Sequence, residues 1–534
     1  MYKKIIALML TSLLALTATA CGNTGGGPSA GTANSASTGG AGESAPYAEH
    51  LEFTVLSLDD APDFMEYPQV KEAMEKFNFS FKIQQVAWDT WDETTRTLVA
   101  TDSLPEVVAW YNLNYSEYLQ WVEQDVFKAF PEDMDEYPNL KEIMDSYDIF
   151  DKITVDGKLY AFPKVINNNP WNEYANLTVM YRRDWARAMK YDFEPVQEIE
   201  WDELVKYLED LKEKDPGKLG DKLVPFDTTH GGLSWVDVAK QWNQSIDGFV
   251  KVDGKYTFGG DDASSLIAIT KLKELYDKGL VAKDAYADKN EAGSERWMAG
   301  RSGVFYTTLS PAYIQSYCEP IMTTYGLNSE DFGVFAIKQD DGKFPIYQKG
   351  EWWGAFAFSS NCRDEVVERW LAVGNWLLED EQIENYAYGV PGEDWTKDAD
   401  GNVTINWTNE DIAAGAEKAY INDQRNFQKF FILEGLDVWL PSNPSVDSYF
   451  VETLYHGLMQ TYDTAPKYKA TDYDLEYFSG PKKDQASGLG AEVRDTVIKA
   501  VVDKNPEQIW NDFIANKKAE TDAVCQELNE ALTK

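Results

Sequence analysis

The sequence predicts an α/β protein with more than one lobe. Between residues 51 and 110, strand-like apolar runs alternate with amphipathic helical segments in the order strand, helix, strand, helix, strand. This order is typical of an open α/β sheet. About 485 residues follow the N-terminal region, which is too many for one hydrophobic core and enough for two lobes.

The first predicted lobe begins with a strand at 51–58, where apolar and polar residues alternate. Pro68 fits the first turn of a helix over 68–77, and a second strand follows at 79–86. The segment 95–110, TRTLVATDSLPEVVAW, then contains a helix end, a turn and a β-branched strand. We expect the lobe to be organised around this segment.

Later segments continue the same alternation. Predicted helices span 118–130, 140–147 and 201–211, and predicted strands span 159–162, 177–181, 223–226 and 303–306. Pro163 is expected to stop the strand before it. Asp156-Gly157 and Asp400-Gly401 are hairpin signals. The second of these also resembles a calcium loop, but Thr396 and Trp407 replace its first and last acidic ligands, so a turn is the better prediction.

The N-terminus resembles a bacterial lipoprotein signal. Lys3 and Lys4 precede an apolar run at 5–16, and Ala18-Thr19-Ala20-Cys21 provides small residues before a cysteine. We expect residues 1–20 to be removed and Cys21 to be lipidated. Residues 21–48 are rich in Gly, Ser, Thr and Ala, which is typical of a flexible tether. The alternative is an ordinary secretory signal with an incidental cysteine.

Composition excludes several classes of function. The net charge of −41 argues against nucleic acid as a partner. The remaining cysteines, Cys318, Cys362 and Cys525, have no CxxC or zinc-site spacing; one bridge is possible, and isolated thiols are the favoured interpretation. With 3 His and no GxSxG, HExxH or P-loop signature, we expect no catalytic residue, metal or cofactor.

Aromatic residues make up 14% of the chain, more than two cores require. Trp110 stands at the carboxyl end of a predicted strand, with Asn112 and Asn114 after it, and such ends are where open α/β sheets bind ligands. A flat ring and amides suit a polyhydroxylated ligand. The alternative is that Trp110 only fills the core.

Several motifs follow one another in an order that resembles that of the extracellular solute-binding proteins of ABC sugar importers, the maltose-binding-protein-like group. They are LPEVVAW (104–110), DGKLYAFP (156–163), LTVMYRRDWARAM (177–189), WDELVKYLEDLKEKDP (201–216), LIAITKLKELYDKGL (266–280) and ERWMAGRSGVF (295–305), the last with Trp297 and Arg301 as departures. The segment 390–403 resembles the long oligosaccharide-binding lipoproteins of Gram-positive bacteria.

The resemblance implies a two-lobed periplasmic-binding-protein type II fold, with the lobes joined by a multi-segment hinge. Lobe 1 would comprise residues 49–165 and 354–430, and lobe 2 residues 166–353 and 431–534. Ligand would be held in the cleft between the lobes, and closure would bend the hinge segments.

Candidate ligand contacts follow from the strand ends and the resemblance together. Trp110 matches a ligand-stacking position of the group, Tyr313 stands where the group has a tryptophan, and one of Trp352 and Trp353 should face the cleft. Arg182 or its neighbour Arg183 would donate to ligand, unless it forms a pair with Asp184. The full set is Asp59, Asp60, Trp88, Trp110, Asn112, Asn114, Trp171, Glu173, Arg182, Trp235, Tyr313, Trp352 and Trp353.

Other tryptophans lie within predicted amphipathic helices, where packing is the better interpretation: Trp185, Trp201, Trp370 and Trp376. Trp242, seven residues after Trp235, is either a neighbour of the site or part of the core, and the core is slightly favoured.

The predicted function is capture of an oligosaccharide and its delivery to an ABC permease. The protein would be a monomer, lipid-anchored at the extracellular face of the cytoplasmic membrane of a Gram-positive bacterium. The alternatives are the same fold binding a peptide or another small solute, and a sensor or adhesin outside import. A two-carboxylate glycosidase is disfavoured, because carboxylate pairs are inevitable among 90 acidic residues.

Overall fold

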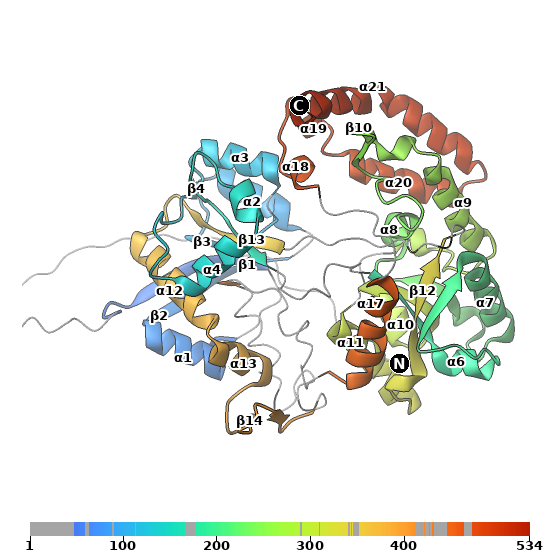
Figure 1. Ribbon diagram of the computed structural model, residues 1–534, viewed down its shortest axis with the longest axis horizontal. Helices are drawn as coiled ribbons and strands as arrows, with labels where there is room; N and C mark the ends of the chain where they lie inside the picture. Colours follow the sequence, from blue (N-terminus) through green and yellow to red (C-terminus); the bar gives the residue numbers. More distant parts are fainter. Residues whose placement is uncertain are drawn as a thin grey trace, which may run out of the picture. The chain divides into compact units, whose positions relative to one another are not determined.

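In the part of the chain that it describes, the computed structural model contains two mixed β-sheets and two small hairpins (Figure 1). It describes residues 47–58, 64–87, 90–112, 114–165, 177–288, 291–308, 310–339, 342, 344, 352–408, 411, 418, 421, 427, 430–431, 446–463 and 472–533. The α/β class predicted from the alternation of strands and helices is confirmed.

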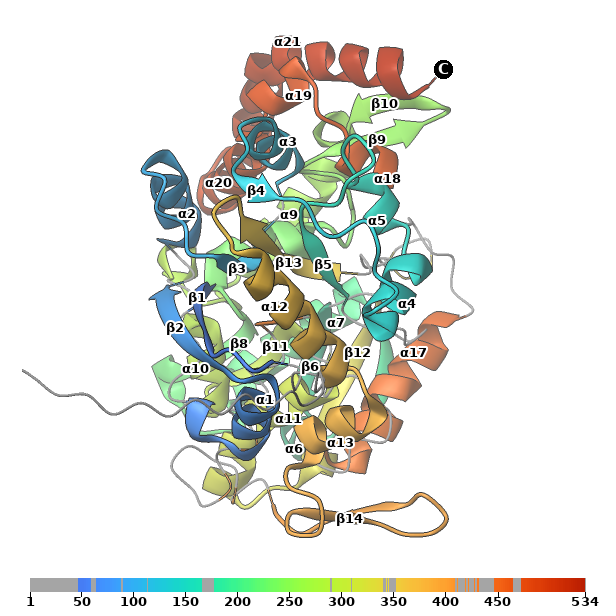
Figure 2. The ribbon, with the colours of Figure 1, turned by 90° about the vertical axis from the view of Figure 1, so that its left-hand side faces the viewer.

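The first sheet has the strand order β2-β1-β3-β13-β4, and β5 also pairs with β13 (Figure 2). Its strands are β1 (Leu51–Leu58), β2 (Phe79–Val86), β3 (Val107–Tyr111), β4 (Phe127–Lys128), β5 (Phe162–Val165) and β13 (Trp352–Ser359). β1 is parallel to β2 and β3, whereas β13 is antiparallel to β3, β4 and β5. The predictions for 51–58 and 79–86 are confirmed.

Helices connect and cover these strands as their amphipathic patterns require. α1 (Pro68–Phe77) begins with Pro68 at its first turn and ends at Asn78 in the left-handed region, which asparagine tolerates well. The other helices of this part are α2 (Trp91–Ala100), α3 (Tyr115–Glu123), α4 (Pro138–Ser146), α5 (Ile149–Lys152), α12 (Asp364–Leu377) and α13 (Asp380–Tyr388). α12 crosses in front of the sheet in Figure 2.

Two predicted boundaries in this part are wrong. Pro163 does not stop a strand; it lies within β5 and pairs with Ala355 of β13. Proline is tolerated there because β5 is an edge strand. Within the described residues, no second strand lies beside it that would need the backbone N–H that proline lacks. The helix expected over 118–130 is instead α3, which ends at Glu123 because the chain turns into β4.

The first core is rich in aromatic rings. Phe53 and Phe79 stack with centroids 4.6 Å apart, and Trp370 stacks on Phe431 at 4.1 Å. Trp370 and Trp376 of α12 are buried among these residues, so their predicted packing role is confirmed.

The second sheet has the order β7-β12-β6-β11-β8. Its strands are β6 (Leu177–Arg182), β7 (Val196–Glu200), β8 (Val224–Thr228), β11 (Ser302–Thr308) and β12 (Phe332–Lys338). β6 is antiparallel to both of its neighbours, whereas β7 and β12 are parallel to each other, as are β8 and β11. All strands of this sheet except β6 therefore run in one direction.

The remaining helices pack mainly against the second sheet and its neighbours. They are α6 (Arg183–Ala188), α7 (Trp201–Lys214), α8 (Trp235–Ala239), α9 (Ser264–Asp277), α10 (Ala292–Met298), α11 (Pro311–Tyr325), α17 (His456–Asp463), α18 (Tyr473–Glu476), α19 (Pro481–Gln485), α20 (Leu489–Val502) and α21 (Pro506–Leu532). Trp185 and Trp201 are buried here, as predicted. In Figure 1, α20 and α21 (red) lie beside α9 and the hairpin formed by β9 (Phe249–Val252) and β10 (Lys255–Phe258).

The structure also bears on the predicted turn at Asp400-Gly401 and on the three cysteines. The Asp400-Gly401 turn joins β14 (Trp395–Lys397) to β15 (Val403–Ile405), and the Asp398 carboxylate accepts hydrogen bonds from the backbone N–H groups of Asp400 and Asn402. The thiols Cys318, Cys362 and Cys525 are free, and the first two are buried. Among the described residues, no helix is long and apolar enough to cross a membrane.

We expect Trp370→Ala to lower the free energy of unfolding by about 3–5 kcal/mol, because it leaves a large cavity under an aromatic cluster. Urea-induced unfolding monitored by far-UV circular dichroism measures the change. Tyr286→Ala is the control, since that ring is 47% exposed and its loss should change stability by about 0.5 kcal/mol or less. Equal effects of the two substitutions would contradict the packing described here.

Candidate ligand-binding site

Strand directions gather several predicted residues at one edge of the first sheet. β1, β2, β3 and β5 run in the same direction, and β13 runs against them, so their carboxyl ends meet the amino end of β13. Trp352 pairs with Val165, and Ala355 pairs with Tyr111. This edge, which we call the first-sheet edge, therefore contains Trp110, Asn112 and Trp352. Ligands of open α/β sheets bind outside such carboxyl ends.

Trp110 is 5% exposed at this edge. Its indole N–H donates to the Asn112 side-chain oxygen at 3.0 Å, and the Asn112 amide donates to Asp92 at 3.1 Å. The Lys164 ammonium lies 5.0 Å from the Trp110 ring centroid, a cation–π contact. Gly354, with φ +70°, packs against the ring so closely that a Cβ there would lie 2.8 Å from it. The predicted stacking role of Trp110 stays a prediction.

Trp352 is half-buried and held by the C-terminal part of the chain. Its indole N–H donates to the Tyr477 hydroxyl at 2.7 Å, and the Tyr477 ring meets Tyr115 edge-on with centroids 5.6 Å apart. Neither Tyr477 nor the buried Lys164 was predicted at this edge. A lysine at the end of an apolar strand was a usable signal for Lys164, whereas nothing local marks Tyr477.

Asn114 has a local structural role. It is the N-cap of α3, and its side-chain oxygen accepts a hydrogen bond from the Glu117 N–H at 3.2 Å. Capping of this kind accounts for the asparagine without a ligand.

The second sheet has a corresponding edge, at which β7, β8, β11 and β12 all end. We call it the second-sheet edge; Trp201 follows β7, Thr229 follows β8 and Gln339 follows β12. Tyr313 lies in the first turn of α11, beyond the end of β11, with 46% of its surface exposed. Its ring lies at 28° to that of Tyr317, with centroids 6.4 Å apart. Among the described candidates, Tyr313 is the most accessible aromatic.

Two other candidates from this part of the chain are deeply packed. Trp235 is buried at the start of α8 and contacts Tyr276. Arg182 is buried and donates two hydrogen bonds to Asp184, at 2.8 and 2.6 Å, while its guanidinium lies 4.4 Å from the Trp185 ring centroid. The pairing of Arg182 with Asp184, the alternative considered from the sequence, is thus observed.

The other candidates lie outside the described residues: Asp59, Asp60, Trp88, Trp171 and Glu173, together with the side chain of Trp353 and the lipidation residue Cys21. Their roles stay predictions.

Glu106, the residue directly before β3, shows how a carboxylate near the first sheet is used. Its oxygens accept from Arg363 at 2.6 and 3.0 Å and from the Thr54 hydroxyl at 3.1 Å. Burial raises the pKa of Glu106, but the hydrogen bonds and charge of Arg363, with those of Thr54, outweigh it and hold the pKa below its ordinary value. This carboxylate ties β1, β3 and the start of α12 together.

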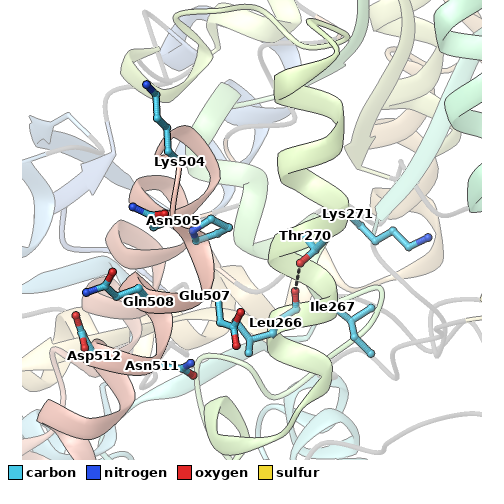
Figure 3. Close-up of a pocket in the computed structure, with 11 residues that line it drawn as sticks. Leu266, Ile267, Thr270, Lys271, Lys504, Asn505, Glu507, Gln508, Asn511 and Asp512 are labelled. Carbon is cyan, nitrogen blue, oxygen red and sulfur yellow. Dashed lines mark hydrogen bonds between the residues drawn. The ribbon is translucent and has the colours of Figure 1, made fainter.

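Two surface hollows are defined by described residues. The larger, about 860 Å³, lies between α9 and the start of α21 (Figure 3). Leu266 and Ile267 supply its apolar part, and mostly polar side chains such as Asn505, Gln508 and Asn511 supply the rest. It contains none of the predicted ligand contacts. The smaller hollow, about 550 Å³, lies beside the β9–β10 hairpin and includes Trp242 and Gln339. No group of three or more His, Cys, Asp or Glu side chains able to hold a metal occurs within the described part of the chain.

The profile of the bacterial extracellular solute-binding protein family matches residues 69–390, which is more than half of the chain and takes in strands of both sheets. The chain belongs to this family. The membership predicted from the order of its motifs is therefore confirmed.

Known relatives agree with this assignment. The fructooligosaccharide ABC transporter substrate-binding protein FusA of Streptococcus pneumoniae is 24% identical over 221 residues, which span 39% of this chain and 40% of that protein. The structure of FusA in complex with kestose matches with a TM-score of 0.64 and 15% identity, covering 88% of this chain and 96% of that one. The alginate-binding protein AlgQ2 matches with a TM-score of 0.68 and 17% identity, covering 92% and 100%. These structural likenesses show the two-lobed solute-binding fold.

We expect Glu106→Gln to lower the free energy of unfolding by about 1 kcal/mol at neutral pH, because it removes a charge-assisted pair that is partly open to solvent. A carboxylate whose pKa is lowered by folding contributes stability above its unfolded pKa, near 4.5, and loses it as the pH falls through the folded value. The difference between the variant and the unchanged protein should therefore disappear in acid. Urea titrations across that range test this, and a difference that is independent of pH would contradict it.

Proposed function

We propose that this protein captures an oligosaccharide outside the cell and delivers it to the permease of an ABC importer. The observation that carries the proposal is the family match over 69–390, which makes the chain an extracellular solute-binding protein. The sugar class is supported by the relatives: FusA is named for fructooligosaccharides, and its structure holds kestose.

The residues at the two sheet edges fit such a ligand chemically. Sugars combine apolar C–H faces with many hydroxyl groups, so a site needs flat rings together with hydrogen-bond donors and acceptors. The first-sheet edge has Trp110, Asn112 and Trp352, and the second-sheet edge has Tyr313. We propose that ligand is held between a lobe around each sheet, with the boundaries predicted above, and that binding favours the closed arrangement of the lobes.

No chemical step is required for this function, and we propose that the protein is not an enzyme. The two alternatives keep the fold: a peptide or another small solute as ligand, or a role as sensor or adhesin. The acidic charge of the chain disfavours anionic ligands such as phosphate or sulfate.

We also propose that residues 1–20 direct export and that Cys21 carries the lipid anchor, with residues 21–48 as tether. A tether of this composition would reach about 25–30 Å from the membrane. The protein would act as a monomer at the extracellular face of the cytoplasmic membrane of a Gram-positive bacterium.

Isothermal titration calorimetry against a panel of fructans, xylans, glucans and short peptides tests the ligand class. We expect at least one oligosaccharide to bind, and Tyr313→Ala to weaken it about 10-fold, because exposed aromatic rings at binding sites are typical hot spots. Trp110→Phe should weaken binding as well, without the cavity that alanine would leave.

Tyr325→Ala is the matched control, since it removes a half-exposed tyrosine at the other end of the same helix, α11. It should leave affinity unchanged. Binding of peptides but not of any saccharide would overturn the sugar assignment and support the first alternative.

Lipidation is tested by expressing the full chain and Cys21→Ser in a Gram-positive host. We expect the unchanged protein to be found in the membrane fraction and to be labelled by a palmitate analogue, because the lipid would be attached to the thiol of Cys21. The variant should be unlabelled and recovered from the medium or as uncleaved precursor. Equal labelling of the two would contradict an anchor at Cys21.

A further inference from the structure

The smaller hollow, which we call the Trp242 pocket, lies at the second-sheet edge. It is formed by the turn at 241–245, the β9–β10 hairpin, the start of α9 and Gln339. Gln339 directly follows β12, and Trp201, which contacts Trp242, directly follows β7. The pocket therefore stands at the carboxyl ends of two neighbouring strands, where α/β sheets bind ligands. Its volume of about 550 Å³ lies within the usual range for small-ligand sites.

Trp242 provides a supported aromatic surface in this pocket. The Trp201 ring meets it at 84°, with centroids 4.6 Å apart, so the indole is fixed from one side. Trp242 is only partly buried, and its N–H makes no hydrogen bond to any described residue. Because Trp242 is only partly buried, a ligand hydroxyl can accept a hydrogen bond from this N–H. Val252, 51% exposed on the hairpin, adds an apolar contact surface.

Polar groups of two kinds surround this ring. Asn243 is committed to structure, since its amide nitrogen donates to the Gly259 carbonyl and the Ser265 hydroxyl, both at 2.8 Å, and so fixes the turn. The side-chain amide of Gln339, by contrast, makes no hydrogen bond to any described residue. Asp262 is exposed and oriented by Ser264, whose N–H donates to one carboxylate oxygen at 2.9 Å. A carboxylate so oriented retains further acceptor sites.

We propose that the Trp242 pocket is a saccharide subsite, which binds one end of an oligosaccharide through stacking on Trp242 and hydrogen bonds to Gln339 and Asp262. This inference rests on the proposed function, because it assigns the same ligand class to a second place on the chain. An aromatic face, an amide and a carboxylate without a basic cluster select a neutral polyhydroxylated ligand over an anion. Its expected contribution is to length selectivity, since only a ligand long enough to reach the pocket gains these contacts.

The test compares affinities along one oligosaccharide series, from disaccharide to hexasaccharide, chosen as the series that the unchanged protein binds best in calorimetry. Trp242→Ala should weaken binding of the longest members about 10-fold while leaving the shortest members unchanged. Trp242→Phe should restore much of the loss, because phenylalanine retains a flat ring.

Gln339→Ala serves as a second variant that removes no packed ring, so it remains informative if Trp242→Ala does not fold. It should weaken the long ligands about 2- to 10-fold, as expected for one hydrogen bond. Gln508→Ala is its matched control: it removes an exposed glutamine from the larger hollow and should change nothing. Bound hexasaccharide should also reduce iodide quenching of tryptophan fluorescence, and this protection should shrink in Trp242→Phe.

The outcomes separate this inference from the proposed function. Unchanged affinities for every length in both Trp242→Ala and Gln339→Ala, with binding intact, would overturn the subsite and leave sugar capture standing. An equal loss of affinity at every ligand length would also overturn the subsite, because the substitution would then act through the stability of the protein and not through contacts with long ligands. Failure of the unchanged protein to bind any saccharide would overturn the proposed function itself.

Discussion

The insertion of β13 into the first sheet is the pairing on which the candidate site depends. This strand comes from more than two hundred residues after β3, yet it pairs with β3 on one side and with β4 and β5 on the other. Register shifts interrupt both pairings near Ala355, and bulges of this kind re-aim side chains at sheet edges. Gly354 within that interruption has a positive φ and no Cβ, so the Trp110 ring can lie directly against the backbone. The position of Trp110 therefore depends on β13, a strand that is distant from Trp110 in the sequence.

Local patterns predicted most of the secondary structure correctly because the forces that produce it are local. The alternation in 51–58 and the helical spacing in 201–211 identified β1 and α7, and Pro68 marked the start of α1. Pro163 shows the limit of the same reasoning. Proline ends a strand only where a neighbour needs its N–H, and whether β5 has such a neighbour is decided by the sheet as a whole.

The candidate site was predictable only in part, for a related reason. The end of the strand before Trp110 could be located from the sequence, so Trp110 and Asn112 were proposed there, whereas Trp352 was proposed from the family resemblance. The strand directions bring all three to one edge, and their role as ligand contacts stays a prediction. Tyr477 could not be found, because the segment that carries it reaches this edge from between α18 and α19. Lys164 is buried beside Trp110, where a charged side chain is normally unfavourable, so a lysine in an apolar strand was the one local signal of an unusual environment.

The two tryptophans at the sheet edges differ in how fully their hydrogen-bonding and packing capacity is used. Trp110 donates to Asn112, lies under the Lys164 ammonium and touches Gly354, so a ligand stacking on it must replace existing contacts. Trp242 is braced from one side by Trp201, and no described residue accepts from its N–H, so a ligand there adds contacts without replacing any that the described residues make. Binding energy depends on the surplus of new contacts over those lost. On the proposed function, a preformed ring such as Trp242 would contribute affinity at little reorganisation cost, whereas stacking on Trp110 would couple binding to rearrangement of the edge around it.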